Sequence, residues 1–193
     1  MRLLDRRRAL MVGNMPILSL VMHGEPSIVD GVMHPNATGW LETPENFTPS
    51  NKPWIIQCSY KRIKNSDWDD FVGGDVMIQG DSGGYTKFYA RSSSSSGWDI
   101  ARGSFLWWVP FGTKMFTRIT YDGESQYAVD TSEDGQTWTR RGSNTSIAVL
   151  AGISPVRLGY VASNTSAINA DFYLEDFGIW IDGVLWCDAH ALL

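Results

Sequence analysis

The sequence predicts an all-β fold, a two-sheet antiparallel jelly-roll sandwich preceded by a short N-terminal arm. Apolar and polar residues alternate with a period of two, such runs recur through most of the chain, and turn-forming dipeptides such as Asp122-Gly123 separate them. The 193 residues are enough for one core, and all-β sandwiches of this length commonly form a single domain. We therefore predict an arm over residues 1–16 and a sandwich over residues 17–193.

The arm begins with a basic cluster, Arg2 and residues 6–8, followed by the apolar residues 9–12. This order resembles a secretory signal, but Gly, Asn and Pro within residues 13–16 break the apolar run, and no small-x-small cleavage site follows. Residues 3–12 are compatible with a short helix, which is marginal without a partner surface. We expect the arm to serve attachment or assembly.

The strand prediction begins after a passage rich in Pro and Gly, which rules out long helices before Pro53. In residues 54–61 one face carries Trp54, Ile56, Cys58 and Tyr60. The same alternation predicts strands over residues 76–79, 85–91, 104–109, 115–121, 126–130, 137–140, 147–150, 156–161 and 172–181.

Turn chemistry separates most of these runs. Asp-Gly pairs supply the positive φ of tight hairpins at Asp122-Gly123, Asp134-Gly135 and Asp182-Gly183. Gly-rich loops are predicted at residues 73–74 and 80–84, and the serine run of residues 92–96 is predicted to be a mobile hairpin loop.

Charge, length and cysteine content exclude several classes of function. The net charge of −5 and the pI near 5.1 argue against nucleic acid as a partner. No stretch reaches the roughly 18 consecutive apolar residues of a membrane span. Two cysteines cannot form a disulfide framework or a four-ligand zinc site. Cys58 and Cys187 both lie in strand-like runs, which favours two buried thiols, while a single bridge stays open.

The C-terminal half carries a recognisable order of strands and turns. A strand that ends in a Tyr-Asp-Gly turn is predicted at residues 116–123, and a second strand follows at residues 127–130. An Asp-Gly turn and Thr-Trp come next, within residues 132–138. The closing strands are predicted at residues 157–160 and 171–183. This order resembles concanavalin A-like and laminin G-like domains over about residues 53–188. The resemblance implies a jelly roll with a concave sheet, used for glycan binding, protein adhesion or, in some branches, glycan hydrolysis, and the fold alone does not choose among them.

The first eleven residues are similar to the starts of tailed-phage and prophage structural proteins, in which a short basic arm precedes a lectin-like head. This similarity implies a virion or extracellular location and a homo-oligomer. It also implies contacts with other virion proteins through residues 1–16.

A glycan hydrolase would need two carboxylates about 5 Å apart facing the sugar. The best candidates, Glu175-Asp176 with Asp182, depart from the alternating pattern, because neighbouring residues of a strand point to opposite faces. The apolar phase shifts between Leu174 and Phe177, so a bulge that unites the pair is plausible. A solvated carboxylate beside a bulge residue explains the pattern more simply. We predict no catalytic residue and no enzymatic activity.

Two clusters of acidic residues resemble calcium sites. Asp130, Ser132, Asp134 and Gly135 match the first half of an EF-hand loop, but Arg141 replaces the closing Glu, which favours a hairpin turn. A second, denser cluster of carboxylates consists of Asp67, Asp69, Asp70 and Asp75, and calcium binding there stays open. No other cofactor is expected, because His23, His34 and His190 lack metal spacing.

Five of the nine tryptophans exceed what one sandwich core easily absorbs, namely Trp68, Trp98, Trp107, Trp108 and Trp180. Sugars stack on exposed rings beside carboxylates. We predict a ligand site at Trp68, Asp69, Trp98 and Trp107 for a glycan or cell-surface ligand. The predicted function is a non-catalytic carbohydrate-binding or adhesion module displayed on a phage virion. The alternative is a purely structural virion or decoration protein, with a glycan hydrolase third. Aromatic residues buried against neighbouring subunits would favour the structural alternative.

Overall fold

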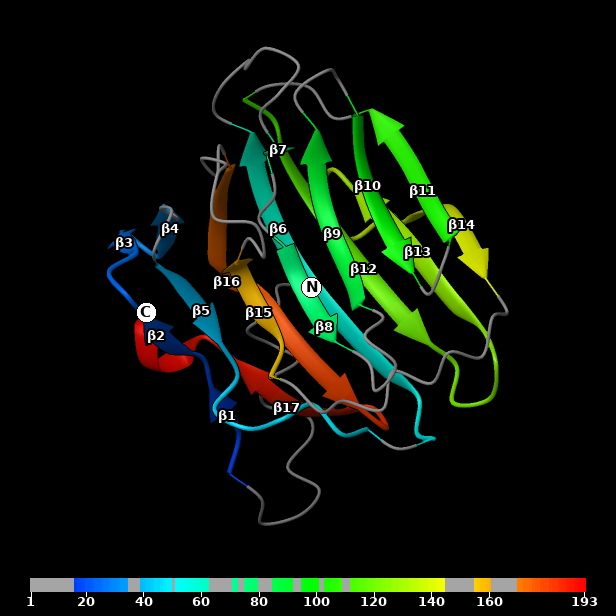
Figure 1. The fold of residues 1–193 in the computed structure, drawn as a ribbon, viewed down its shortest axis with the longest axis horizontal. Helices are drawn as coiled ribbons and strands as arrows, with labels where there is room; N and C mark the ends of the chain where they lie inside the picture. Colours follow the sequence, from blue (N-terminus) through cyan, green and yellow to red (C-terminus); the bar gives the residue numbers. More distant parts are fainter. Residues whose placement is uncertain are drawn as a thin grey trace.

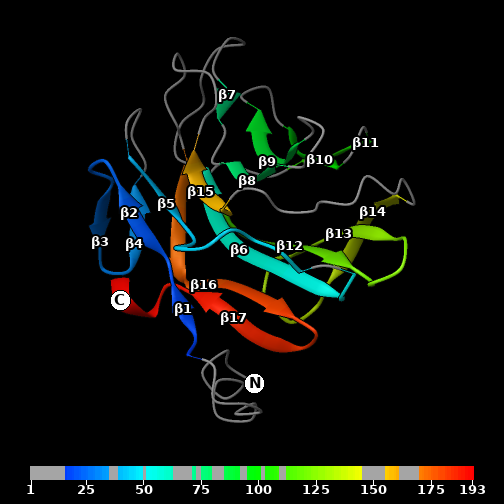
Figure 2. The ribbon, with the colours of Figure 1, turned by 60° about the horizontal axis from the view of Figure 1, so that its bottom comes forward.

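The computed structural model describes residues 16–34, 39–49, 51–62, 71–72, 75–79, 85–91, 95–100, 103–108, 112–144, 155–160 and 170–193. Within these ranges the strands form two sheets that lie face to face (Figures 1 and 2), which confirms the two-sheet jelly roll. Sheet A has nine strands, β1 (Leu18–Ser19), β3 (Ser27–Val29), β4 (Val32–His34), β6 (Trp54–Arg62), β12 (Lys114–Tyr121), β13 (Tyr127–Ser132), β14 (Thr139–Asn144), β16 (Ala170–Ile181) and β17 (Val184–Asp188).

Sheet B covers the inner face of sheet A. Its eight strands are β2 (Val21–His23), β5 (Trp40–Glu42), β7 (Phe71–Val72), β8 (Asp75–Gln79), β9 (Tyr85–Arg91), β10 (Ser95–Ile100), β11 (Gly103–Trp108) and β15 (Arg157–Tyr160). One 3₁₀ turn, η1 (His190–Leu192), follows β17. Among the described residues, no helix is long and apolar enough to cross a membrane.

The centre of sheet A is built by β6, with β16 on one side and β12 on the other. The register aligns Ile56 with both Ile119 and Ile179, so apolar side chains from three strands meet in one row of the core. Trp54, Ile56, Cys58 and Tyr60 are all buried, as the period of two predicts. The opposite, outer face of sheet A is left for polar and aromatic side chains.

The structure has two short hairpins with the same kind of turn, of which the sequence predicted one. The β16–β17 hairpin turns at the predicted Asp182-Gly183, where both residues have positive φ. The β3–β4 hairpin turns in the same way at Asp30-Gly31, with φ values of 50° and 73°, although no strand was predicted there. Both turns therefore have the backbone sign of type I′, which matches the twist of the strands.

The serine run was predicted as a loop throughout, and this is wrong at its end. β10 begins at Ser95 and pairs Ser96 with both Ala90 and Trp107, because the backbone there completes a hairpin on each side. Residues 92–94 lie outside the described residues, as do the predicted arm helix over residues 3–12 and the predicted strand over residues 147–150.

Both thiols are free and buried. Strand β16 lies between β6, which carries Cys58, and β17, which carries Cys187. Two strand spacings separate their backbones by about 9.5 Å. A disulfide cannot bridge Cα atoms more than about 7 Å apart.

Candidate ligand-binding site

The candidate site begins with an interruption in β16. Tyr173 pairs with Ser59 of β6, but the next pair is Gly178 with Gln57, so residues 174–177 all face the single residue Cys58. Leu174 is buried, whereas Glu175 is exposed. This is the bulge that the phase shift in the apolar pattern made plausible, and it brings Glu175 and Asp176 toward the outer face together.

Lys114 of β12 joins the two carboxylates. Its Nζ lies 2.6 Å from Oδ2 of Asp176 and 3.6 Å from Oε1 of Glu175. The Ser59 hydroxyl donates a 2.6 Å hydrogen bond to the same Asp176 oxygen. Asp176 is therefore committed to a structural contact across three strands, while Glu175, with a side chain 68% exposed, is open to solvent.

Two aromatic rings complete the surroundings of this ammonium group. The Lys114 Nζ lies 4.1 Å from the centre of the Tyr173 ring and 5.0 Å from that of Phe116. Such cation–π contacts contribute about 0.5 to 1 kcal/mol at exposed sites. Lys114 thus packs over one face of the Tyr173 ring on the sheet surface.

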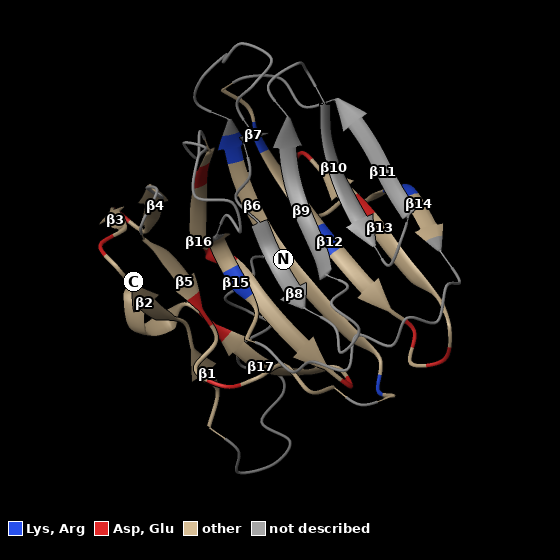
Figure 3. Ribbon diagram, in the orientation of Figure 1, with Lys and Arg blue, Asp and Glu red and all other residues tan. Residues whose placement is uncertain are grey.

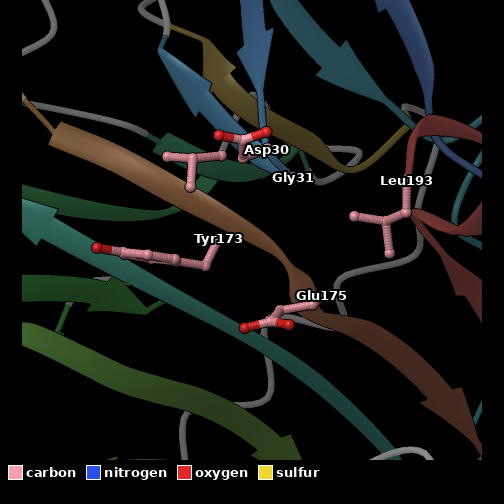
Figure 4. Close-up of a pocket in the computed structure, with 6 residues that line it drawn as sticks. Asp30, Gly31, Tyr173, Glu175 and Leu193 are labelled. Atoms are coloured by element: carbon pink, nitrogen blue, oxygen red, sulfur yellow. The ribbon is translucent and has the colours of Figure 1, made fainter.

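Beside Tyr173 lies an open pocket of about 370 Å³ (Figure 4). Its walls come from the β3–β4 turn, β16 and the C-terminal residue, and consist of Asp30, Gly31, Val32, Tyr173, Glu175 and Leu193. The Leu174 N–H donates a 2.9 Å hydrogen bond to the Gly31 carbonyl, which fixes the turn against the bulge. Segments more than 130 residues apart in sequence therefore form one site.

The pocket combines a flat ring, two aliphatic side chains and two carboxylates. Asp30 and Glu175 are exposed, so both can accept hydrogen bonds from a ligand. Figure 3 shows Asp and Glu on β5, β13 and β16 and Lys and Arg on β6, β12, β14 and β15, so neither sign forms a continuous field over the described strands. Small-molecule sites typically pair apolar walls with a few placed polar groups.

The three carboxylates considered for a hydrolase, Glu175, Asp176 and Asp182, do not come together. Asp182 lies in the exposed β16–β17 turn with a φ of 54°, at the far end of the strand from the bulge. Asp176 is held by Lys114 and Ser59, and Glu175 faces solvent.

The EF-hand-like run is a hairpin turn, as predicted. The Asp134 carboxylate accepts hydrogen bonds from the backbone of Thr137 and Gln136 and from the Ser132 hydroxyl, which lower its pKa. Asp130 is buried and bound by Arg118 and Arg140. Within the described ranges, no group of three His, Cys, Asp or Glu residues is placed to hold a metal.

The predicted ligand and metal sites lie outside what the structure describes. Trp68, Asp69, Asp67 and Asp70 fall in the gap at residues 63–70. Trp98, Trp107 and Asp75 lie on β10, β11 and β8, whose backbones alone are described. These assignments stay predictions.

Sequence reasoning missed Tyr173, Lys114 and Asp30. A partial signal existed for Tyr173, because alternation in β16 places its side chain on the other face of the sheet from the buried Phe172 and Leu174. Asp30-Gly31 carries the same dipeptide signal as the recognised turns. No local signal could show that these residues meet.

Solved structures with the same architecture include a lectin, a toxin binding domain and a GH43 protein. Peanut lectin with a nonamer peptide matches with a TM-score of 0.51 at 11% identity, over 83% of this chain and 92% of the lectin. The binding domain of botulinum neurotoxin serotype D matches with a TM-score of 0.57 at 8% identity, over 84% of this chain and 43% of that domain. A GH43 protein from Bacillus licheniformis matches with a TM-score of 0.50 at 12% identity, over 83% of this chain.

The chain thus has the lectin-like jelly-roll fold that the sequence resemblance implied. It spans nearly the whole of the peanut lectin chain but only 43% of the toxin domain and 39% of the GH43 protein. No protein-family profile and no curated protein matches the sequence. At these identities the likeness establishes the fold, and the site itself must carry the function.

Proposed function

We propose that this chain is a non-catalytic carbohydrate-binding or adhesion module and that the pocket beside Tyr173 receives the sugar. One observation carries the proposal: an aromatic ring and two exposed carboxylates, Asp30 and Glu175, surround one open pocket. The apolar face of a sugar ring stacks on an aromatic side chain, and its hydroxyls donate hydrogen bonds to carboxylates. The lectin-like fold supports the same function.

The non-catalytic part of the proposal follows from how the carboxylates are used. Hydrolysis with retention needs a nucleophile and a separate acid on either side of the scissile bond. Here Asp176 shares Lys114 with Glu175 on one side of the site, and the Ser59 hydroxyl also donates to it. Glu175 and Asp176 therefore bind one ammonium group from the same side and do not form an opposed pair.

The biological setting is also part of the proposal. We place the module on a phage virion or otherwise outside the cell, as a homo-oligomer attached through residues 1–16. The basis is the basic opening of the chain and its similarity to phage structural proteins. A second ligand surface stays a prediction at Trp68, Asp69, Trp98 and Trp107. Calcium binding at the neighbouring carboxylates also stays open.

A glycan array followed by titration calorimetry tests the function. Tyr173→Ala should weaken binding of the best glycan by about tenfold or more, since an aromatic anchor typically contributes more than 1 kcal/mol. Tyr173→Phe, which keeps the ring, should retain most of the affinity. Glu133→Gln, an exposed carboxylate on the β13–β14 hairpin, is the matched control for Glu175→Gln.

Absence of binding to every glycan by the oligomeric full-length chain would overturn the proposal and favour a purely structural virion protein. Glycan cleavage by the wild-type chain that Glu175→Gln abolishes would overturn the non-catalytic assignment.

A further inference from the structure

The outer face of sheet A carries a second aromatic residue in line with Tyr173. Trp180 follows Gly178 on β16, and both lie on this face because they are two residues apart. A Cβ atom added to Gly178 would clash with Cη2 of Trp180 and lie within 3 Å of two further ring atoms. The Trp180 ring therefore occupies the space above Gly178 and lies along the sheet surface.

This position does not belong to the core. Trp180 is half-buried and pairs with Ile55 and Leu185, and it is not among the partly buried apolar residues that pack against the core. A ring laid along a sheet face over a glycine leaves a flat surface next to solvent. Such a surface is suited to stacking rather than to filling space.

The register gives the spacing between the backbone positions of the two residues. Tyr173 pairs with Ser59 and Trp180 with Ile55, so these positions lie four residues apart as measured along the uninterrupted strand β6. At the rise of a β-strand this is about 13 Å, which is longer than one sugar ring. The Trp180 ring reaches back over Gly178, in the row of Gln57, so the ring lies closer to Tyr173 than its backbone does.

Two polar residues continue the row of Gly178 across the sheet. Gln57 of β6 pairs with Gly178, and Arg118 of β12 pairs with Gln57. Arg118 is 30% exposed and packs over Trp138 at 4.1 Å, which holds its guanidinium on the surface. Gln57 is buried, so the accessible polar group of this row is the Arg118 guanidinium. Its Nε donates to Asp130, and its remaining N–H groups can donate to sugar hydroxyls.

We infer that the ligand is a linear oligosaccharide that lies along β16, with one ring on Tyr173 and a later ring on Trp180. This inference rests on the proposed function and extends it from a sugar pocket to an extended site. A monosaccharide can reach only one of the two rings. Affinity should therefore grow with chain length until both rings are covered.

Calorimetry with a series from the monosaccharide to the hexasaccharide of the best glycan tests the inference. The wild-type hexasaccharide affinity should exceed the monosaccharide affinity by about tenfold or more. Trp180→Ala should remove this gain and leave the monosaccharide affinity within about twofold. Gly178→Ala should act like Trp180→Ala, because its Cβ displaces the ring without deleting it, whereas Trp180→Phe should keep part of the gain.

Other outcomes separate the two proposals. Equal affinity for short and long ligands, unchanged by Trp180→Ala, overturns the extended site but not the pocket. A change of oligomeric state in Trp180→Ala, measured by light scattering and without any effect on glycan affinity, also overturns it and assigns the ring to contact between copies. If the wild-type chain binds no glycan, both proposals fail. Thermal unfolding of each variant shows whether a loss of affinity reflects loss of the fold.

Discussion

The Nε2 atom of His23 lies 2.8 Å from Oε1 of Glu42, and the His23 ring stacks on Trp40 at 5.3 Å. These contacts hold the short strand β2 to β5. The other Glu42 oxygen accepts hydrogen bonds from the Trp40 indole at 3.2 Å and from Arg157 at 3.1 Å. One carboxylate thus connects β2, β5 and β15 at the end of sheet B.

Replacing Glu42 with Ala should therefore destabilise this end of the sheet. Three donors lose one acceptor that is only 15% exposed, and we expect a loss of about 1 to 3 kcal/mol. Hydrogen exchange should show reduced protection in β2 and β5. Glu45→Ala, an exposed carboxylate three residues on, is the control and should change little. Unchanged protection of β2 in Glu42→Ala would show that backbone pairing alone holds this strand.

Gly31→Ala should cost more than Gly183→Ala, although both glycines occupy the same position of an Asp-Gly turn. Their φ values are +73° and +76°, so both alanines pay about 1 to 2 kcal/mol for the left-handed backbone. A Cβ at Gly31 also lies 3.1 Å from Cδ2 of Leu193, whereas nothing lies within 4 Å of one at Gly183. Chemical denaturation measures the difference. Because Leu193 lines the pocket, only the Gly31 variant should alter ligand affinity. Equal effects on stability and affinity would contradict the Leu193 contact.

Acid should weaken the β13–β14 hairpin through Asp134. Hydrogen bonds from the Thr137 and Gln136 backbone and from Ser132 lower the pKa of this carboxyl below its ordinary value of 3.8. A lowered pKa in the folded state contributes stability above the ordinary value, and this contribution is lost as the pH falls toward the lowered one. Asp134→Asn should therefore be less stable than wild type near pH 7, and the gap should narrow below about pH 3. Thermal melts across this range measure it. If the stability difference between wild type and Asp134→Asn does not change with pH, the effect comes from the shape of the Asp134 side chain rather than from its charge.

Neither thiol should react in the folded protein. Burial, followed by the nearby charge of Asp176, raises the pKa of Cys58 to about 12, and burial, followed by Asp188, raises the pKa of Cys187 to about 12. The reactive thiolate is then scarce near pH 8. Iodoacetamide should label neither residue in the native state and both after unfolding without a reductant, as read by mass spectrometry. Recovery of a Cys58–Cys187 disulfide peptide would contradict the strand order of sheet A.

Much of sheet A could be predicted from the local alternation of apolar and polar residues in the sequence. Alternation in β6 identified Trp54, Ile56, Cys58 and Tyr60 as one buried face, and the loss of apolar phase after Leu174 located the bulge. These features depend on residues close in sequence, where a period of two is a strong signal. The turn at Asp182-Gly183 was identified for the same reason.

The pocket beside Tyr173 could not be predicted from such local patterns. Strands of three residues, such as β3 and β4, are too short to show a period, so the turn at Asp30-Gly31 was overlooked. Tyr173 becomes part of a pocket only because β4 pairs with β16, which places Val32 opposite Tyr173. The register of strands so distant in sequence depends on tertiary packing rather than on local propensity.

The position of β16 has a consequence for how the chain reaches its fold. The hairpins β12–β13 and β13–β14 join neighbours in sequence and can form early, but β6 keeps an open edge until residues 170–181 pair with it. Contacts between segments this far apart close slowly. During that interval the β6 edge is free to pair with another chain. Association of nascent or refolding molecules at this edge should therefore be the main competitor of folding, and it ends when β16 docks.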